Sequence, residues 1–168
     1  MGTLSKALGS SGGYICGCRA MIDYLINKAR SFIFSTAPNP GAVAAASAAI
    51  KIVRSPEGEF LCNKLWKNVD DFYRALQHPF GSVCDKNPHF ILSAIIPLIV
   101  GDETVAIDLA RNLREQGYFI PAVRYPAVAK KTARLRLTMS ARYSIDQISA
   151  LVSTLCKLNI SGRFRPNS

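Results

Sequence analysis

The sequence predicts an α/β fold, because strand-like and helix-like patterns alternate through the second half of the chain. Three observations support this prediction. An apolar run over 91–100 precedes a helical pattern over 102–116, residues 133–139 alternate between apolar and polar side chains, and an amphipathic helix with a capping box begins at Ser144. Segments in this order are typical of a small layer of strands covered by helices.

The first half of the chain predicts a different organisation, with two long helices and little sheet. Four short elements come first: a loop over 9–13, a buried strand over 14–18, a helix over 20–30 and a β-prone run over 31–36. Cys16 and Cys18 alternate with Ile15 and Gly17 in the second of these elements. Small buried thiols are therefore expected at both positions.

Two longer helices follow. Asn39 and Pro40 supply an N-cap and a first-turn proline for a helix over 41–53, and Ser55-Pro56 ends it. A second helix, over 57–77, has apolar side chains at helical spacing: Phe60, Leu61, Leu65, Val69, Phe72 and Leu76. The many alanines of the first helix allow another element to pack closely against it.

The second half begins with a βαβ pattern. Pro97 places the strand over 91–100 at a sheet edge or a bulge, because proline lacks the N–H that a central strand uses. Asp102 caps the next helix, Gly117 ends it, and a second strand follows over 118–123.

The last strand and helix have the clearest patterns. Leu135, Leu137 and Met139 share one face of the strand over 133–139. Ser144 and Gln147 form the capping box of the final helix, whose apolar stripe is Ile145, Ile148, Leu151, Val152, Leu155 and Leu158. The chain thus divides into a loop–helix–helix region over 1–78, an α/β layer over 79–160 and a tail over 161–168.

The composition is that of one compact domain. A chain of 168 residues that is 49% hydrophobic and 19% charged can form a core and is not a disordered sequence. The net charge of +10 raises nucleic-acid binding as a hypothesis, but the Lys and Arg residues are scattered and no reading motif is present. Local bunching occurs at Lys130, Lys131, Arg134 and Arg136. A basic face that attracts an anionic substrate such as an acyl-CoA fits the same charge, and we expect no nucleic-acid partner.

The five cysteines and two histidines follow no metal-ligand or disulfide spacing, so no metal site is predicted. Unpaired thiols are typical of a reducing compartment, and the cytoplasm is the expected location. No secretory signal is visible, and the most apolar stretch, 90–100, is too short for a membrane span. We therefore expect a soluble protein with no membrane partner.

The stretch from Thr3 to Gly13 is the most informative for chemistry. Lys6 lies among small residues and glycines, which let a planar cofactor approach its amine. A lysine removed from water also loses its proton more readily, as Schiff-base chemistry requires. The hydroxyls of Thr3 and Ser5 could donate to a phosphate. On composition alone, however, a solvated lysine in a surface turn is the more common arrangement.

Four segments resemble, in order and spacing, the α-oxoamine synthases, which are fold-type I pyridoxal-phosphate enzymes. They are residues 2–14 (GTLSKALG and then GGY), 30–37 (RSFIFSTA), 95–101 (IIPLIVG) and 124–138 (RYP and then TARLRLT). Within the family, residues 25–37 most resemble the 8-amino-7-oxononanoate synthases of biotin biosynthesis. The resemblance covers most of the chain. It implies that residues 1–78 end the cofactor-binding large domain and that residues 79–160 form the small C-terminal α/β domain.

The resemblance also implies roles for residues of the N-terminal region. Lys6 would hold pyridoxal phosphate covalently and later move protons at the substrate α-carbon, and Thr3 would bind the cofactor phosphate. Ser35 or Thr36 matches the position that reaches the phosphate of the partner subunit, which implies a homodimer with shared active sites.

Two arginines would bind substrate. Arg124 matches the arginine that binds the amino-acid carboxylate, a task suited to a bidentate guanidinium, and Arg136 would support the same pocket or line it. The implied reaction condenses L-alanine with a pimeloyl thioester of CoA or a carrier protein, releases the thiol and loses the carboxylate. The residues that stack on the cofactor ring and pair with its nitrogen in the family precede the lysine motif and lie outside this chain.

Some alternatives stay open. Residues 124–127 (RYPA) stand where Arg-Pro-Pro-Thr is common in the family, and residues 142–143 (RY) stand where Ala-His is usual. A substrate pair like that of glycine C-acetyltransferase or 5-aminolevulinate synthase is therefore an alternative, and an inactive remnant that packs against a full-length subunit is another. A third alternative makes Thr3 and Lys6 the nucleophile and base of an acyl-enzyme hydrolase, whose partner motifs are missing.

Overall fold

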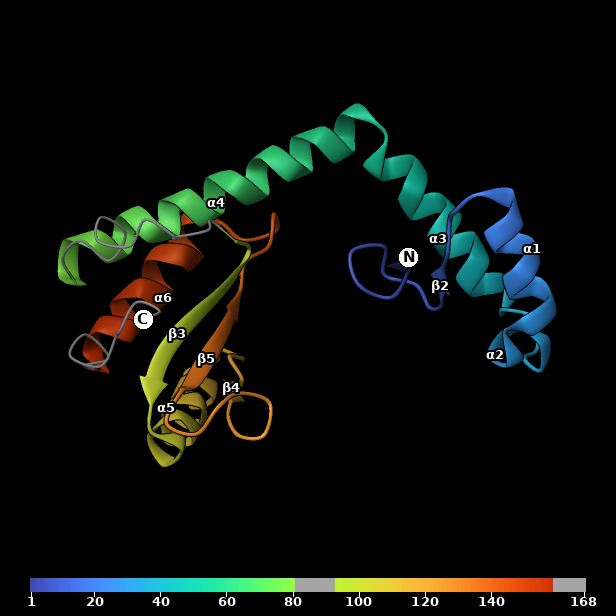
Figure 1. The fold of residues 1–168 in the computed structure, drawn as a ribbon. Helices are drawn as coiled ribbons and strands as arrows, with labels where there is room; N and C mark the ends of the chain where they lie inside the picture. The colour runs from blue at the N-terminus through green and yellow to red at the C-terminus, as the bar shows by residue number, and fades with distance from the viewer. Residues whose placement is uncertain (81–92, 159–168) are drawn as a thin grey trace. The chain divides into compact units, whose positions relative to one another are not determined.

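The computed structural model describes residues 1–80 and 93–158, including the side chains of 1–76 and 93–158. The chain divides into two compact units, Met1–Phe60 and Leu61–Ser168, and each is described by itself. Figure 1 draws the helices and strands of both and labels all of them except β1. The predicted tail over 161–168 and the start of the strand predicted over 91–100 lie outside the described residues.

The N-terminal unit contains a small hairpin and three complete helices: β1 (Gly2–Thr3), β2 (Gly13–Tyr14), α1 (Arg19–Lys28), α2 (Arg30–Ile33) and α3 (Pro40–Val53). β1 and β2 pair antiparallel, with Thr3 opposite Gly13. α3 begins as predicted, because the side chain of Asn39 accepts a hydrogen bond from the N–H of Gly41 at 2.8 Å and Pro40 is the first helical residue.

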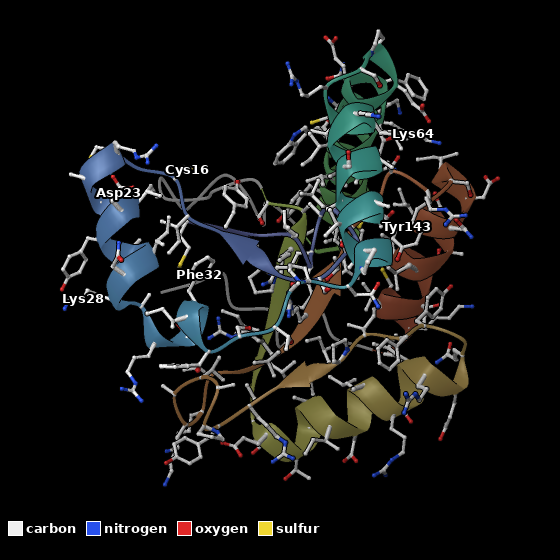
Figure 2. The ribbon with its side chains drawn as sticks, turned by 90° about the vertical axis from the view of Figure 1, so that its right-hand side faces the viewer. Cys16, Asp23, Lys28, Phe32, Lys64 and Tyr143 are labelled. Carbon is white, nitrogen blue, oxygen red and sulfur yellow. The ribbon has the colours of Figure 1, made fainter. Side chains whose placement is uncertain are left out.

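Two predicted strands in this unit are wrong. Residues 15–18 contain no strand, and Cys16 and Cys18 are exposed; Figure 2 shows Cys16 on the segment that leads into α1. The run over 31–36 contains part of α2, and the N–H of Phe34 bonds to the carbonyl of Arg30 at 3.0 Å. A strand needs a neighbouring strand for its hydrogen bonds. β1 and β2 pair with each other, so a local helical turn satisfies these N–H groups instead.

α4 (Pro56–Phe80) begins in the N-terminal unit and continues into the C-terminal unit. Gly58 makes its start possible, since a Cβ there would lie 2.4 Å from the carbonyl oxygen of Ile52 near the end of α3. Val69, Phe72 and Leu76 of α4 are buried in the C-terminal unit. By packing, the second half of this helix therefore belongs with the α/β layer. The predicted boundary between the large and the small domain of the family, between residues 78 and 79, stays a prediction.

The C-terminal unit adds three strands and two helices: β3 (Ile95–Gly101), α5 (Glu103–Glu115), β4 (Ala122–Val123), β5 (Ala133–Thr138) and α6 (Ile145–Lys157). The strand order is β3-β5-β4, and both outer strands run antiparallel to β5. The predicted βαβ pattern therefore takes a split form, because β5 lies between the two strands that α5 connects. The strand predicted over 118–123 is too long, since only β4, over 122–123, pairs with β5. Pro97 lies on the edge strand β3, as predicted.

The helices of this unit cover one face of the sheet (Figure 1). One apolar core unites Val69, Phe72 and Leu76 of α4, Leu109 and Leu113 of α5 and Ile148, Val152 and Leu155 of α6 with Ile96, Leu98, Leu135 and Leu137 of the strands. Residues alternate across a strand, so the other face of the sheet presents Pro97, Arg136 and Thr138, which are exposed. The predicted alternation over 133–139 is confirmed.

Local signals fix the ends of α5 as predicted. Asp102 accepts a backbone N–H of the first turn at 3.0 Å. Gly117, with φ of 87°, follows the helix. The N–H of Tyr118 donates to the carbonyl of Leu113 at 2.8 Å, and the N–H of Gly117 donates to the carbonyl of Arg114 at 3.0 Å. This pair of bonds is the Schellman motif. The motif favours glycine at position 117, because the backbone there is left-handed.

The predicted capping box of α6 is also present. The N–H of Gln147 donates to Ser144 Oγ at 3.2 Å, and the N–H of Ser144 donates to Gln147 Oε1 at 3.0 Å. Just before this cap, the side-chain amide of Asn68 on α4 donates to the carbonyls of Ser140 and Tyr143 at 2.9 and 3.0 Å. The segment between β5 and α6 is thereby attached to α4.

Among the described residues, no helix is long and apolar enough to cross a membrane. No three His, Cys, Asp or Glu side chains gather there in a group that could hold a metal ion. The described cysteines are free thiols: Cys16, Cys18, Cys62 and Cys156.

Candidate cofactor and substrate site

The loop between β1 and β2 holds Lys6 in a closed turn. The N–H of Leu4 donates to the carbonyl of Gly12 at 2.9 Å, and the N–H of Gly9 donates to the carbonyl of Lys6 at 3.0 Å. A third bond, from the N–H of Ser10 to the carbonyl of Leu4 at 3.0 Å, crosses the loop. Gly9 and Gly12 have φ of 58° and 95°, which glycine adopts without strain. The backbone is thus well defined, whereas the Lys6 side chain is exposed.

Two hydroxyls lie beside this turn. Thr3 Oγ1 and Ser5 Oγ are 2.8 Å apart, and the N–H of Ser5 donates to Thr3 Oγ1 at 3.3 Å. Both residues are exposed, so both hydroxyls can reach a phosphate. Ser10 Oγ donates to the carbonyl of Ala42 on α3 at 2.5 Å and attaches the loop to that helix. No local sequence pattern indicates this role of Ser10, because its partner lies 32 residues away.

Ser35 and Thr36 lie between α2 and α3, and both are exposed. The N–H of Ser35 donates to the carbonyl of Phe32 at 3.3 Å, and Ser35 Oγ donates to the carbonyl of Thr36 at 3.5 Å. Neither hydroxyl bonds to the Lys6 loop within the described residues. Both are accessible from outside the unit, as a contact with a second subunit requires.

Arg124 lies on the connection between β4 and β5, in the C-terminal unit. The N–H of Ala127 donates to the carbonyl of Arg124 at 2.9 Å across a cis Tyr125–Pro126 peptide. Lys130 Nζ lies 5.4 Å from the ring centre of Tyr125, at cation–π distance. The side chain of Arg124 is exposed and forms no ion pair with a described carboxylate.

Arg136 lies on β5, and its N–H donates to the carbonyl of Pro121 at 2.9 Å. It lines an open groove of about 730 Å³ between residues 117–121, the end of β5 and α6. The lining is mostly apolar and includes Ile120, Leu137, Met139 and Leu151, and Arg136 is its one charged residue. A single cation beside an apolar surface suits an anionic ligand with a hydrocarbon part.

The candidate residues therefore form two sets. Lys6 and Thr3 share one loop of the N-terminal unit, and Arg124 and Arg136 share the β4–β5 hairpin of the C-terminal unit. Each set is held by main-chain hydrogen bonds inside its own unit.

Comparison with known proteins gives the class of protein to which these features belong. The chain is a member of the aminotransferase class I and II family, whose sequence pattern matches residues 1–155. It is 37% identical over 158 residues to 8-amino-7-oxononanoate synthase from Chromobacterium violaceum, in an alignment that covers 94% of this chain and 39% of the relative. The predicted resemblance to the α-oxoamine synthases, and among them to 8-amino-7-oxononanoate synthase, is confirmed.

Solved structures confirm the fold class. 8-Amino-7-oxononanoate synthase from Francisella tularensis matches with a TM-score of 0.74 and 26% identity, over 94% of this chain and 44% of that one. Serine palmitoyltransferase from Sphingomonas wittichii matches with a TM-score of 0.80 and 25% identity, over 98% and 40%. The chain thus has the fold of part of a fold-type I transferase and spans about two fifths of the length of these relatives.

Pyridoxal phosphate is the cofactor that the family indicates. A serine palmitoyltransferase structure of the same fold, 21% identical to this chain, was solved with it. The Lys6 loop fits this group, because it offers an exposed primary amine for the aldehyde and two neighbouring hydroxyls for the phosphate. The loop also has free space beside Gly9 and Gly12 for the cofactor, since a Cβ at either position would meet no atom within 4 Å.

Proposed function

We propose that this chain is the lysine-bearing C-terminal part of an acyltransferase that condenses L-alanine with a pimeloyl thioester in biotin biosynthesis. The observation that carries this proposal is the closed loop around Lys6, with its exposed amine and the paired hydroxyls of Thr3 and Ser5, in a chain that matches the family over residues 1–155. The relatives that bear the name 8-amino-7-oxononanoate synthase support the choice of substrates.

Each residue has a defined task in this proposal. When bound, pyridoxal phosphate supplies an electron sink for the charge that develops at the amino-acid α-carbon. Lys6 holds the cofactor and transfers a proton at that carbon, and Thr3 donates its hydroxyl to the phosphate. Arg124 binds the alanine carboxylate with its guanidinium fork. Arg136 carries the positive charge at the wall of the apolar groove.

The overall reaction joins the α-carbon of alanine to the acyl carbonyl carbon. The thiol of CoA or of the carrier protein leaves, and the carboxylate departs as carbon dioxide. In this proposal the amine of Lys6 accepts and returns the proton. Its loop stays in place during the transfer, because three main-chain hydrogen bonds hold the turn. The thioester is the second substrate, and its acyl chain is the hydrocarbon part that suits the groove beside Arg136.

A homodimer with shared active sites is part of the proposal. Ser35 and Thr36 are exposed and have hydroxyls accessible to a second subunit. The cytoplasm is the proposed compartment, since the described cysteines are free thiols, as is typical of reducing conditions.

Borohydride reduction in the presence of pyridoxal phosphate tests the role of Lys6. Peptide mapping of the reduced protein is expected to find the pyridoxyl group on Lys6, and the Lys6→Arg variant is expected to lose it. Lys28 is an exposed lysine on α1 of the same unit (Figure 2), so Lys28→Arg is the matched control and should label like the parent. Equal labelling of Lys28 and Lys6 in the parent chain would refute the assignment.

A further inference from the structure

The β4–β5 hairpin and the residues that flank it have an uncompensated positive charge. From residue 116 to residue 145 the sequence contains no Asp or Glu and six cations: Arg124, Lys130, Lys131, Arg134, Arg136 and Arg142. None of the ion pairs of the described residues includes any of them. The charge of this one segment is thus a large part of the net +10 of the chain.

Four residues of this hairpin lie near its loop and form what we call the cationic hairpin: Tyr125, Lys130, Lys131 and Arg134. The loop projects from the end of the sheet (Figure 1). Tyr125 is 52% exposed with Lys130 over its ring, and Arg134 lies where β5 begins, with its Nε donating to the carbonyl of Thr132 at 3.1 Å. An exposed aromatic ring among cations is a combination that binds bases and phosphates.

The backbone at Lys131 is a second, independent observation. The N–H of Thr132 donates to the carbonyl of Ala129 at 3.2 Å and closes a four-residue turn. Lys131 is the third residue of this turn and has φ of 64°, a left-handed conformation that glycine or asparagine adopts more readily. A lysine side chain makes this left-handed conformation less favourable than glycine would. Such strained positions are concentrated at functional sites.

The two carboxylates that follow the neighbouring strand β3, Asp102 and Glu103, both belong to the start of α5. Gly101 of β3 lies opposite Ala133. Asp102 follows it and accepts the N–H of Val105 as the cap of α5, and Glu103 lies in the first turn of that helix. Neither forms an ion pair with the hairpin, so its cations keep their charge for a ligand.

We propose that the cationic hairpin binds the 3′-phosphorylated ADP part of the acyl-CoA substrate. Lys130, Lys131 and Arg134 pair with its phosphates, and the ring of Tyr125 stacks against the adenine. The identity of the ligand as CoA rests on the proposed function. Arg124 stays assigned to the amino-acid carboxylate and Arg136 to the apolar groove, and neither is part of this site.

Calorimetric titration of the full chain with CoA, dephospho-CoA and pantetheine tests this site. We expect affinity to fall in that order, because each step removes phosphate. Lys130→Gln combined with Lys131→Gly should weaken CoA binding about tenfold for each charged contact that is lost, and should abolish the preference for CoA over dephospho-CoA. Glycine suits the left-handed backbone at 131, so the melting temperature of this variant should not fall.

The matched control removes two charges away from the hairpin. Lys51 on α3 and Lys64 on α4 are exposed, and Lys51→Gln with Lys64→Gln should leave CoA affinity unchanged. Equal loss in both double variants, or pantetheine binding as tight as CoA binding, would overturn the proposal. So would binding of a phosphopantetheinylated carrier protein without binding of CoA, which would assign the hairpin to a protein partner.

This site and the proposed function can fail separately. The titrations need no pyridoxal phosphate, and a Lys6→Ala variant is expected to bind CoA like the parent. CoA binding without labelling of Lys6 by borohydride would remove the cofactor role and keep the hairpin site. Labelling of Lys6 without phosphate-dependent CoA binding would remove the hairpin site alone.

Discussion

Asn68 on α4 donates its side-chain amide to the carbonyl of Ser140, 2.9 Å away and 72 residues later in the sequence. Asn68 is 6% exposed and is the buried polar residue of the described core. A second bond from the same amide reaches the carbonyl of Tyr143 at 3.0 Å. One side chain therefore satisfies two carbonyls of a segment that has no regular structure, directly before the cap of α6.

Replacing Asn68 by alanine is expected to lower the free energy of unfolding by about 2 kcal/mol, because both carbonyls lose a buried donor. Urea unfolding followed by circular dichroism measures the change. Asn63 is exposed on the same helix, so Asn63→Ala is the control and should change stability by less than about 0.5 kcal/mol. Equal effects at the two positions would contradict the structural role of Asn68.

Ser144→Ala removes the cap of α6 and should destabilise the protein by about 1 kcal/mol. Ser149 lies exposed inside the same helix, where alanine is the better helix former, so Ser149→Ala should leave stability unchanged or raise it. Thermal denaturation of both variants gives the comparison. If Ser149→Ala lowers stability and Ser144→Ala does not, the capping box has no energetic role.

Gly117→Ala forces a Cβ into the left-handed backbone that ends α5, with φ of 87°. The expected loss of unfolding free energy is about 1–2 kcal/mol. Gln116, the residue before it, has φ of −91°, and Gln116→Ala should change stability little. The midpoints of guanidinium unfolding distinguish the two. If both variants unfold at the same denaturant concentration, the Schellman motif does not determine the end of this helix.

Arg124→Lys tests the carboxylate-binding role with the charge kept. Lysine cannot form the bidentate pair, so alanine binding by the protein loaded with pyridoxal phosphate should weaken by about 1.5–3 kcal/mol, or roughly tenfold to 150-fold. The change in cofactor absorbance on titration with L-alanine reports the affinity. Arg142→Lys is the control, since Arg142 is exposed and lies outside the β4–β5 connection. Unchanged alanine affinity in Arg124→Lys would remove the residue from the site.

The sequence predicted the elements whose signals are local. Asp102, Gly117 and Ser144 act on backbone groups within a few residues, so their roles follow from sequence alone. The strand over 133–139 was predicted from its alternation, because one of its faces is buried. The segments over 14–18 and 31–36 were wrong for the opposite reason. A strand depends on a partner elsewhere in the chain, and no pattern in these short apolar runs identifies one.

Sequence also identified only part of the candidate site. Lys6 and Thr3 were proposed from motifs, and the structure places both in one loop closed by main-chain hydrogen bonds. The bond from Ser10 to Ala42 depends on the packing of a loop on a distant helix, so no local pattern indicates it. The strained backbone at Lys131 can be recognised only from its φ angle, which the sequence does not contain. Its charged surroundings, however, are visible in the sequence as a stretch of thirty residues, 116–145, without a carboxylate.

The two faces of the β3-β5-β4 sheet differ in what a substitution costs, because the helices of the C-terminal unit pack on one of them. Leu135 and Leu137 belong to the core, whereas Arg136 and Thr138 point to the other side of the same strand. Substitutions at the latter two positions leave the apolar core intact, so we expect them to cost little stability. One strand thus separates the residues that maintain the fold from those at which the sequence can change without disturbing the core.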